Sequence, residues 1–197
     1  MARHRDYFSQ QAQKLGLRAR SAFKMAEIAR RFGIFQRGQV VIDLGAAPGG
    51  FLQVIVQQVG PQGVVVGIDL VDIRPLGQPN VKTAVLDVLM DDFDARLEAL
   101  HPGLVDVVVS DLAPKTTGIR TTDAARSLRL ASKALDVACR KCRPGAHFIA
   151  KVFMGSGFED FRNELARHYK GVKIVRPQAT RGASMEIYFV GLGFQAH

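Results

Sequence analysis

VVIDLGAAPGG, residues 40–50, is the stretch that decides the fold of this 197-residue chain. Its β-branched beginning predicts a buried strand, and its glycine-rich end predicts a tight turn that opens the next helix. Gly45, Gly49 and Gly50 let the backbone approach a ligand closely, and the small side chain of Ala46 keeps that surface clear. The stretch therefore predicts a binding loop for a nucleoside-bearing ligand at one edge of an α/β sheet.

Outward from this loop, short β-branched runs alternate with helical patterns, which implies parallel strands joined by crossover helices. Residues 105–109 are apolar almost throughout, as expected when helices cover both faces of the sheet. Only residues 176–185 separate the last two strands, so we expect those strands to be antiparallel neighbours. The predicted fold is a Rossmann-like α/β domain with a seven-stranded, mostly parallel sheet, an antiparallel last strand and helices on both faces. The expected strands are residues 40–44, 64–70, 81–87, 105–111, 146–153, 172–175 and 186–191, and the expected helices are residues 21–32, 50–58, 93–100, 122–142 and 157–169.

The positive charge is concentrated at the N-terminus. Residues 1–37 hold nine Lys and Arg against two acids, whereas residues 38–197 hold 18 against 16. We therefore divide the chain into a basic, RNA-facing arm and helix over 1–37 and a single catalytic domain over 38–197, because such an arm suits a polyanion. The alternative is a solvated basic tail. A second basic stretch, residues 120–143, is interpreted as the solvated face of the long helix.

The composition, 47% hydrophobic and 23% charged, indicates a globular protein with a core. No uninterrupted apolar run of about 18 residues is available for a membrane span, and residues 1–13 lack the apolar segment of a secretory signal. We therefore expect a cytoplasmic protein. Cys139 and Cys142 form a CxxC pair at the end of a helical pattern, which favours a structural over a redox role. No second pair completes a zinc site, so no metal is expected.

Three classes of ligand use glycine-rich loops like residues 45–50. A phosphate loop requires GxxxxGK[ST], but Phe51 and Leu52 follow Gly50 here. A dinucleotide site requires GxGxxG, and GAAPGG lacks the middle glycine. S-adenosylmethionine fits, with its amino-acid end along the loop and its adenosine at the carboxyl ends of the next strands.

Aspartates end three successive predicted strands beside this loop. Asp69 could accept hydrogen bonds from the ribose hydroxyls of the cofactor, and Asp87 from its adenine amino group. Asp111 ends the fourth strand. A single aspartate at a strand end is more often a turn or cap residue, but three in succession favour a cofactor site.

Three more charged residues stand where burial is expected. Lys151 interrupts an apolar strand, Glu186 begins the final strand, and Lys24 lies on the predicted helix 21–32. Burying a charge is costly unless it is paired, so these residues indicate either a functional cluster or an internal salt-bridge network.

With these residues in place, the sequence strongly resembles the FtsJ-like family of ribose 2′-O-methyltransferases. The resemblance rests on residues 18–24 (RARSAFK), 43–50 (DLGAAPGG), 110–114 (SDLAP), 151–153 (KVF) with Gly155 and Gly157, and 186–188 (EIY), which occur in family order over nearly the whole chain. Two departures are visible. Phe51 stands where relatives often have Trp, and residues 180–185 are less rich in Arg and Ser than in the ribosomal enzymes.

The resemblance implies methylation of a ribose 2′-hydroxyl, and we expect the substrate to be a uridine of 23S-type ribosomal RNA within the large subunit, methylated by a monomer. Transfer RNA or the messenger RNA cap is the alternative substrate, and an inactive RNA-binding assembly factor is the alternative of another class. The resemblance also implies a Lys-Asp-Lys-Glu tetrad at Lys24, Asp111, Lys151 and Glu186. The expected cofactor contacts are Asp43, Gly45, Ala46, Pro48, Gly49, Gly50, Phe51, Asp69, Leu70, Asp87, Val88 and Asp111, and the expected RNA contacts are Arg18, Arg20, Arg30 and Arg31.

Lys151 is the candidate base for the ribose hydroxyl. Burial and the charge of Lys24 would favour its neutral form, whereas Asp111 and Glu186 would oppose it. If Lys151 stays charged, it orients the nucleophile instead, and the carboxylates become the proton acceptors.

Overall fold

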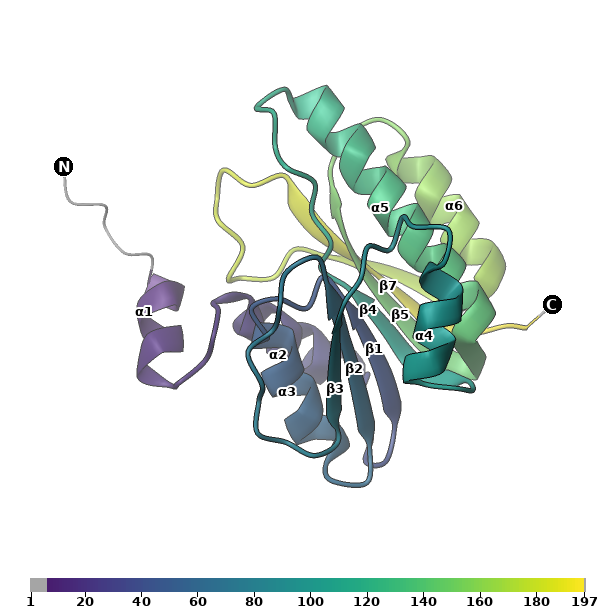
Figure 1. Cartoon of the computed structure of the whole chain (residues 1–197). Coiled ribbons are helices and arrows are strands. Elements are labelled where there is room, and N and C mark those ends of the chain that lie inside the picture. The colour runs from purple at the N-terminus through teal and green to yellow at the C-terminus, as the bar shows by residue number, and fades with distance from the viewer. Residues whose placement is uncertain (1–6, 197) are drawn as a thin grey trace.

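A computed structural model describes residues 7–196 as a sheet covered by helices on both faces (Figure 1). Seven strands form this one sheet in the order β3-β2-β1-β4-β5-β7-β6. β7 is antiparallel to both of its neighbours, β5 and β6, and the remaining neighbours pair in parallel. The predicted Rossmann-like fold is therefore confirmed. The strands are β1 (Val40–Leu44), β2 (Val64–Asp69), β3 (Val81–Val85), β4 (Val105–Ser110), β5 (Cys142–Phe153), β6 (Tyr169–Val175) and β7 (Glu186–Phe194), and the helices are α1 (Tyr7–Lys14), α2 (Ser21–Phe32), α3 (Gly50–Val59), α4 (Phe93–Leu100), α5 (Arg120–Lys141) and α6 (Phe158–His168).

Alternate side chains of the central strands point into two separate cores, because successive residues of a strand face opposite sides of the sheet. Ile42 and Leu44 of β1 pack with residues of α4, α5 and α6. Val41 packs on the other face with residues of α2 and α3. Burial on both faces explains why the strand is apolar, and Asp43 is the one residue of β1 that breaks this pattern.

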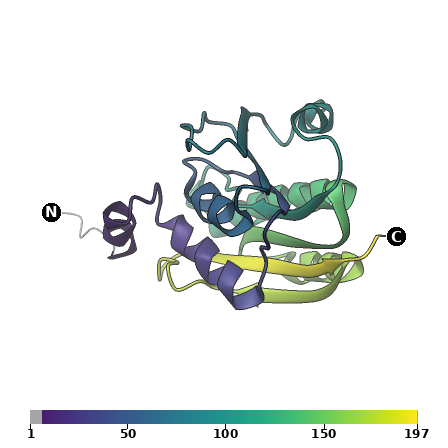
Figure 2. The same ribbon diagram turned by 90° about the horizontal axis from the view of Figure 1, so that it is seen from below.

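Helix α2 is part of the packed body. Met25 and Ile28 are fully buried and share a core with Tyr188 and Val190 of β7 (Figure 2). α1 projects from that body in both views and touches it through Phe8, whose ring centroid lies 5.7 Å from that of Phe23 on α2. By its packing, α2 belongs to the same core as the domain that follows residue 37. The division of the chain at residue 37 is therefore a prediction about where RNA binds. Three charged residues of the predicted arm, Arg3, Arg5 and Asp6, lie outside the described residues.

Two of the strands that lead to the binding edge are shorter than predicted. β2 ends at Asp69 and β3 at Val85, whereas strands were expected to residues 70 and 87. Asp69 accepts a hydrogen bond from the N–H of Val71 at 3.1 Å, and Asp87 accepts one from the N–H of Leu89 at 2.9 Å. Such bonds to the backbone two residues on turn the chain away from the sheet. β4 likewise ends at residue 110, so Asp111 follows the strand.

The C-terminal strands are longer than predicted. β5 begins at Cys142, directly after the last residue of α5, and β6 and β7 also extend beyond their expected limits. Cys139 and Cys142 are both free thiols at this helix-to-strand junction. Burial raises the pKa of Cys139 to about 11 and that of Cys142 to about 12, so both stay protonated near neutral pH. None of the helices within residues 7–196 combines the length and apolarity needed to cross a membrane.

Candidate active site

A cleft of about 690 Å³ opens at the carboxyl ends of the parallel strands. This is where ligands bind in open α/β sheets, and the volume suits a small molecule. Six of the predicted cofactor residues line the cleft: Gly45, Asp69, Leu70, Asp87, Val88 and Asp111.

The loop after β1 shapes the floor of this cleft. Gly45 has a φ of +80°, and a Cβ atom placed on it would lie 2.8 Å from the backbone nitrogen of Leu112. A side chain at this position would therefore collide with the chain that carries Asp111. Gly49 also has a positive φ, +104°, where glycine is strongly favoured. The requirement for glycine at these two positions agrees with the close backbone approach predicted from the sequence.

Ala47 also lines the cleft, but the other residues of the loop do not. Ala46, Gly49 and Gly50 are buried, and Pro48 is exposed. Phe51 is 3% exposed and points into the core, where its ring centroid lies 6.4 Å from that of Tyr188. A core position suits Phe as well as Trp, so the departure at residue 51 leaves the cleft unchanged. Contacts of these residues with the cofactor stay a prediction.

Arg18 holds this loop from outside. Its guanidinium donates hydrogen bonds to three backbone carbonyls, those of Pro48 at 3.2 Å, Pro75 at 2.7 Å and Arg74. The backbone N–H of Arg18 is also bound, 2.7 Å from the side-chain oxygen of Gln53 on α3. These bonds give Arg18 a positioning role that the sequence did not indicate. The predicted phosphate contact would have to compete with them.

Asp69 and Asp87 combine a turn role with a place in the cleft wall. Besides Val71, Asp69 accepts a hydrogen bond from the N–H of Ala47 at 2.9 Å, which connects β2 to the loop after β1. Each carboxylate oxygen has more than one lone pair, so both side chains retain acceptor capacity toward a ligand. The structure therefore shows the turn role of both aspartates, and their contact with the cofactor stays a prediction.

Asp43 lies beneath the cleft and has no exposed surface. Neither carboxylate oxygen has a hydrogen-bond partner among the described residues. Burial, and next the carboxylates of Asp111 and Asp69, raise the pKa of Asp43 well above its usual range. A buried acid without a partner is costly, which makes Asp43 the least satisfied group of the site.

Two oppositely charged pairs lie at this site, one in the wall of the cleft and one in a separate hollow of about 260 Å³. Lys151 of β5 is 7% exposed; its Nζ donates to the backbone carbonyl of Asp111 at 2.5 Å and forms an ion pair with Oδ1 of Asp111 at 3.0 Å. Lys24 of α2, also 7% exposed, donates to Oε1 of Glu186. The structure thus buries both lysines of the predicted tetrad and gives each one a carboxylate.

Tyr188 links the two pairs, and sequence reasoning missed its role. Its hydroxyl donates to Oδ1 of Asp111 at 2.8 Å, and Nζ of Lys24 lies 5.9 Å from the centroid of its ring. Burial, and next the charge of Asp111, raise the pKa of Tyr188 well above its usual range, so the hydroxyl stays a donor. Tyr188 pairs with Lys151 across β5 and β7. The period of two in β7, which places Tyr188 beside Glu186, was the signal that could have indicated it.

Two of the four predicted RNA-contacting arginines line a second hollow of about 670 Å³ on α2. Arg30 and Arg31 line it together with Phe8, Phe23 and Gln178. Arg20 donates to the carbonyl of Ala179 at 2.6 Å, so this loop between β6 and β7 is attached to α2.

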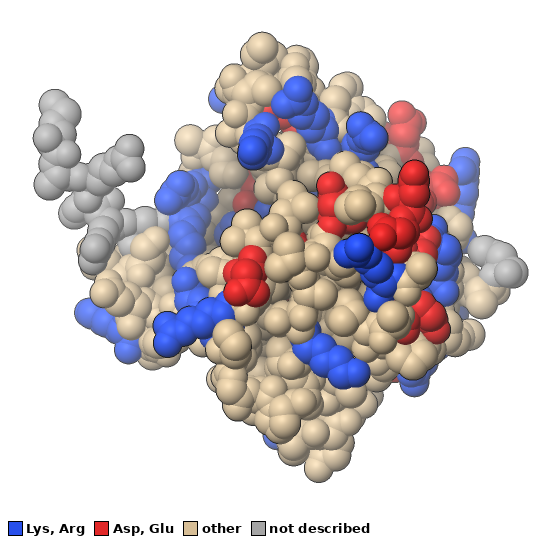
Figure 3. All heavy atoms as spheres, in the orientation of Figure 1, with Lys and Arg blue, Asp and Glu red and all other residues tan. Residues whose placement is uncertain are grey.

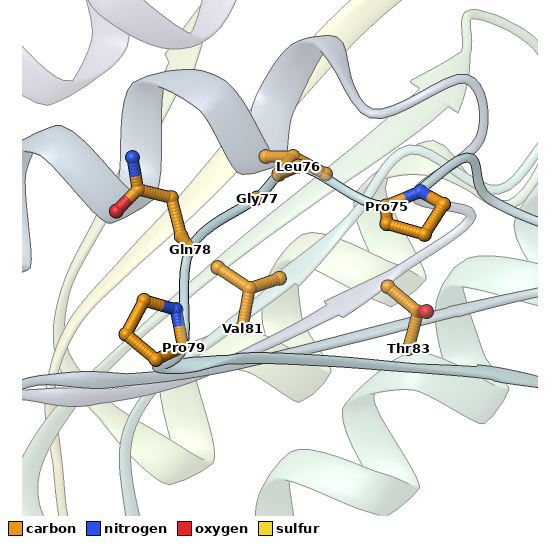
Figure 4. A pocket seen from close by; sticks show the side chains of 7 residues that line it. All are labelled: Pro75, Leu76, Gly77, Gln78, Pro79, Val81 and Thr83. Atoms are coloured by element: carbon orange, nitrogen blue, oxygen red, sulfur yellow. The ribbon is translucent and has the colours of Figure 1, made fainter.

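A third hollow, of about 470 Å³, lies at the outer edge of the sheet, away from the charged groups (Figure 4). The figure shows Val81 and Thr83 of β3 pointing toward the loop that carries Leu76. None of its seven lining residues is ionisable, so this hollow offers no group for acid–base chemistry.

The glycine loop, the acids at successive strand ends and the sheet order define a Rossmann-like methyltransferase. Comparison with known proteins gives the family: residues 17–194 match the FtsJ-like methyltransferases, and the chain belongs to that family. It is similar to the ribosomal RNA large subunit methyltransferase E of Myxococcus xanthus, with 61% identity over 96% of this chain and 89% of the relative. The protein of the same name from Alkalilimnicola ehrlichii is 41% identical over 97% and 91% of the two chains. A crystal structure from Plasmodium falciparum, described under the name of ribosomal RNA methyltransferase, has the same fold, with a TM-score of 0.81, 23% identity, and 91% and 100% coverage of the two chains.

Proposed function

We propose that this protein transfers a methyl group from S-adenosylmethionine to the 2′-hydroxyl of a uridine in large-subunit ribosomal RNA. The observation that carries the proposal is the pair of lysine–carboxylate contacts, Lys151 with Asp111 and Lys24 with Glu186, joined by Tyr188. The relatives named as large-subunit ribosomal RNA methyltransferases support the choice of substrate. A ribosomal substrate would place the reaction in the cytoplasm.

The residues of the cleft fit S-adenosylmethionine. Asp69 and Asp87 would hold its ribose and adenine, and the backbone at Gly45 leaves room for its amino-acid end. The ammonium and sulfonium groups of the cofactor are positive, whereas the unpartnered carboxylate of Asp43 lies beneath the cleft. A bound cation would relieve the repulsion among Asp43, Asp69 and Asp111.

When bound, the cofactor supplies a methyl group attached to a sulfonium sulfur. That sulfur is a good leaving group, because it departs as a neutral thioether. The chain must then align the ribose oxygen and remove its proton, and alignment alone supplies about 7–11 kcal/mol in favourable cases. Lys151 donates one of its three N–H bonds to the carbonyl of Asp111 and pairs by charge with Oδ1, so an N–H bond remains for the 2′-oxygen. We assign Lys151 to orientation of that oxygen. Oδ1 of Asp111 accepts from Tyr188 and faces the charge of Lys151, which leaves Oδ2 to accept the hydroxyl proton.

The second hollow would receive the RNA beside the target ribose. Phe8 and Phe23 offer rings on which unpaired bases stack, and Arg30 and Arg31 offer charges for phosphates. Lys24, on the same helix as these arginines, connects this surface to the catalytic groups.

The direct test is methyl transfer from radiolabelled S-adenosylmethionine to large ribosomal subunits purified from cells that lack the protein. We expect label in the large-subunit RNA, and mapping of 2′-O-methylated positions should show one uridine that is methylated only when the protein is present. Label in transfer RNA or capped messenger RNA with none in the subunit would contradict the proposed substrate. No transfer to any RNA would contradict the proposed activity.

Asp43→Asn should separate stability from cofactor binding. Because folding raises the pKa of Asp43, the folded chain holds this proton more tightly than the unfolded chain. The charge of Asp43 therefore destabilises the protein increasingly as pH rises above the usual range of aspartate. In the absence of cofactor, we expect the variant to have a higher Tm than the wild type, and the difference in Tm should grow with pH. Each kcal/mol of free energy of unfolding corresponds to about 2–4 °C in Tm. Its affinity for S-adenosylmethionine should fall about tenfold, which is about 1.4 kcal/mol.

Thermal unfolding across a pH series and calorimetric titration with S-adenosylmethionine measure these two effects. A Tm difference that is the same at all pH values would show that the charge of Asp43 is not the cause. An unchanged affinity would remove Asp43 from the cofactor site.

A further inference from the structure

We propose that Lys115, Arg126 and Arg129 form a second RNA-binding surface, the α5 lip, which holds phosphates of the RNA strand on the side of the cleft opposite to α2. The inference rests on the proposed function and adds a contact surface to it. Sequence reasoning interpreted the cations of residues 120–143 as one solvated helix face, whereas in the structure Arg126 and Arg129 line the cleft and three others, Arg140, Lys141 and Arg143, form ion pairs.

The α5 lip lines the same cleft as Asp111 and Lys151. Lys115 comes from the segment between β4 and α5, and Arg126 and Arg129 come from α5 itself. Residues three apart on a helix lie on the same side, so both arginines can face the cleft together. Their charges therefore lie at the wall of the catalytic cleft, where an RNA strand must pass to bring its ribose to Lys151.

Ion pairing distinguishes the lip from the other end of α5. There Arg140 pairs with Asp94 at 3.0 Å, and Lys141 pairs with Glu98 at 2.6 Å. Just beyond the helix, Arg143 pairs with Asp106 at 3.4 Å. Lys115, Arg126 and Arg129 are exposed and form no ion pair with any residue in the range 7–196. Although acids also line the cleft and Arg126 acts electrostatically on Asp123, the three charges of the lip are not held in ion pairs, and such charges attract a polyanion.

The acid nearest in sequence, Asp123, is already occupied. Its carboxylate accepts hydrogen bonds from the N–H of Thr117 at 2.7 Å, the hydroxyl of Thr117 at 2.8 Å and the N–H of Gly118 at 3.1 Å. On the same helix, the buried Ser127 accepts a bond from the N–H of Phe153 at the end of β5. These bonds fix the segment after Lys115 and the first turns of α5, so the lip is a supported surface.

The charge of the cofactor argues against a cofactor role for the lip. S-adenosylmethionine carries two positive groups and one carboxylate, so three additional cations would oppose its binding. The RNA carries one negative charge per nucleotide and extends on both sides of the target ribose. In Figure 3, Lys and Arg side chains lie with few acids at the left, near α1, and at the top, near the start of α5, whereas at the right they are mixed with Asp and Glu. A strand with its ribose at Lys151 would contact both basic surfaces.

The test compares Arg126→Gln/Arg129→Gln with a control that removes the same charge elsewhere, Lys170→Gln/Lys173→Gln on β6. Both control lysines are exposed. Binding of a fluorescent oligouridine is measured by anisotropy over a range of salt concentrations. Loss of two phosphate contacts should reduce the slope of log K against log salt by about 1.4, since each contact on a single strand contributes about 0.7. The control should keep the wild-type slope, and both variants should keep the wild-type affinity for S-adenosylmethionine.

Methyl transfer to large ribosomal subunits is the second measurement, and we expect a raised KM for the lip variant with kcat near that of the wild type. A wild-type salt slope would overturn the proposal, as would a loss of S-adenosylmethionine affinity in the lip variant. If the lip variant raises KM for ribosomal subunits but does not change the binding of oligouridine, the lip would contact a ribosomal protein. That result would also overturn the proposal. If the wild type methylates no RNA but the slope still falls, the lip stands as an RNA surface and the proposed activity fails separately.

Discussion

Lys151→Ala should lose methyl transfer by about 10²–10⁴-fold in kcat while its affinity for S-adenosylmethionine stays within a few-fold of the wild type. Without Lys151 the ribose oxygen is no longer oriented toward Asp111, so most of the benefit of proton transfer to that carboxylate, typically about 10²–10⁴-fold, should be lost. Lys151 contacts Asp111 at the end of the cleft, whereas the predicted adenosine contacts, Asp69 and Asp87, lie on β2 and after β3. The alanine should therefore remove the group that orients the ribose oxygen and leave the cofactor contacts in place. Single-turnover transfer of a radiolabelled methyl group, with calorimetric titration of the cofactor, measures both quantities.

Lys141→Ala is the matched control, because it also removes a buried, ion-paired lysine. Lys141 is 9% exposed and bonds to Glu98 and to the carbonyl of His101, outside the cleft. We expect it to lower Tm without lowering kcat. Near-normal turnover in Lys151→Ala would end the assignment of Lys151. A wild-type rate that keeps rising with pH through the alkaline range would instead make Lys151 the base.

The fold was predictable because its signals are local. Residues 40–44 read as a strand, residues 21–32 and 93–100 read as helices, and the structure places all three with the predicted limits. The ends of β2 and β3 moved where side chains bond to nearby backbone, at Asp69 and Asp87. Helix α1 was missed because it is only eight residues long and buries only Ala12.

The residues of the site could be proposed from the sequence, but the contacts between them could not. Lys24 and Glu186 are far apart in sequence, and no local pattern states that each lysine has its own carboxylate. Arg18 and Tyr188 show the same limit. A basic residue near the N-terminus suggests phosphate, yet the guanidinium of Arg18 bonds to loop carbonyls that only the folded chain brings near. The hydroxyl of Tyr188 finds Asp111 because β7 inserts between β5 and β6.

These contacts explain how a short chain combines a cofactor site with an RNA site. The parallel strands end at the cofactor cleft, whereas antiparallel β7 enters the sheet at that same edge and brings Glu186 and Tyr188 to it. α2 then covers β7 and adds Lys24. The groups that would handle the ribose therefore lie between the cofactor strands and the basic helix, so a strand bound on α2 would present its ribose to the cleft.

The close approach of the loop after β1 to the chain at Asp111 leads to the second large effect, in Gly45→Ala. Its Cβ atom would lie 2.8 Å from the backbone nitrogen of Leu112 and 3.0 Å from the carbonyl carbon of Asp111. Backbone atoms cannot swing aside as a side chain can, so either the cofactor loop or Asp111 must move. We expect affinity for S-adenosylmethionine to fall at least tenfold, about 1.4 kcal/mol or more. Methyl transfer should fall further, because the same shift displaces Asp111 from Lys151.

Gly38→Ala separates this collision from simple backbone strain. Gly38 has a φ of +81°, close to the +80° of Gly45, but a Cβ atom added to Gly38 would have nothing within 4 Å. Both variants should lose about 1–2 kcal/mol of stability to the left-handed conformation, and Gly45→Ala should lose about 1–3 kcal/mol more to overpacking. At about 2–4 °C per kcal/mol, thermal unfolding resolves that difference. The expectation fails if Gly45→Ala and Gly38→Ala have equal Tm values and Gly45→Ala keeps the wild-type affinity for the cofactor. The loop would then tolerate a side chain, and its close contact with the chain at Asp111 would not shape the site.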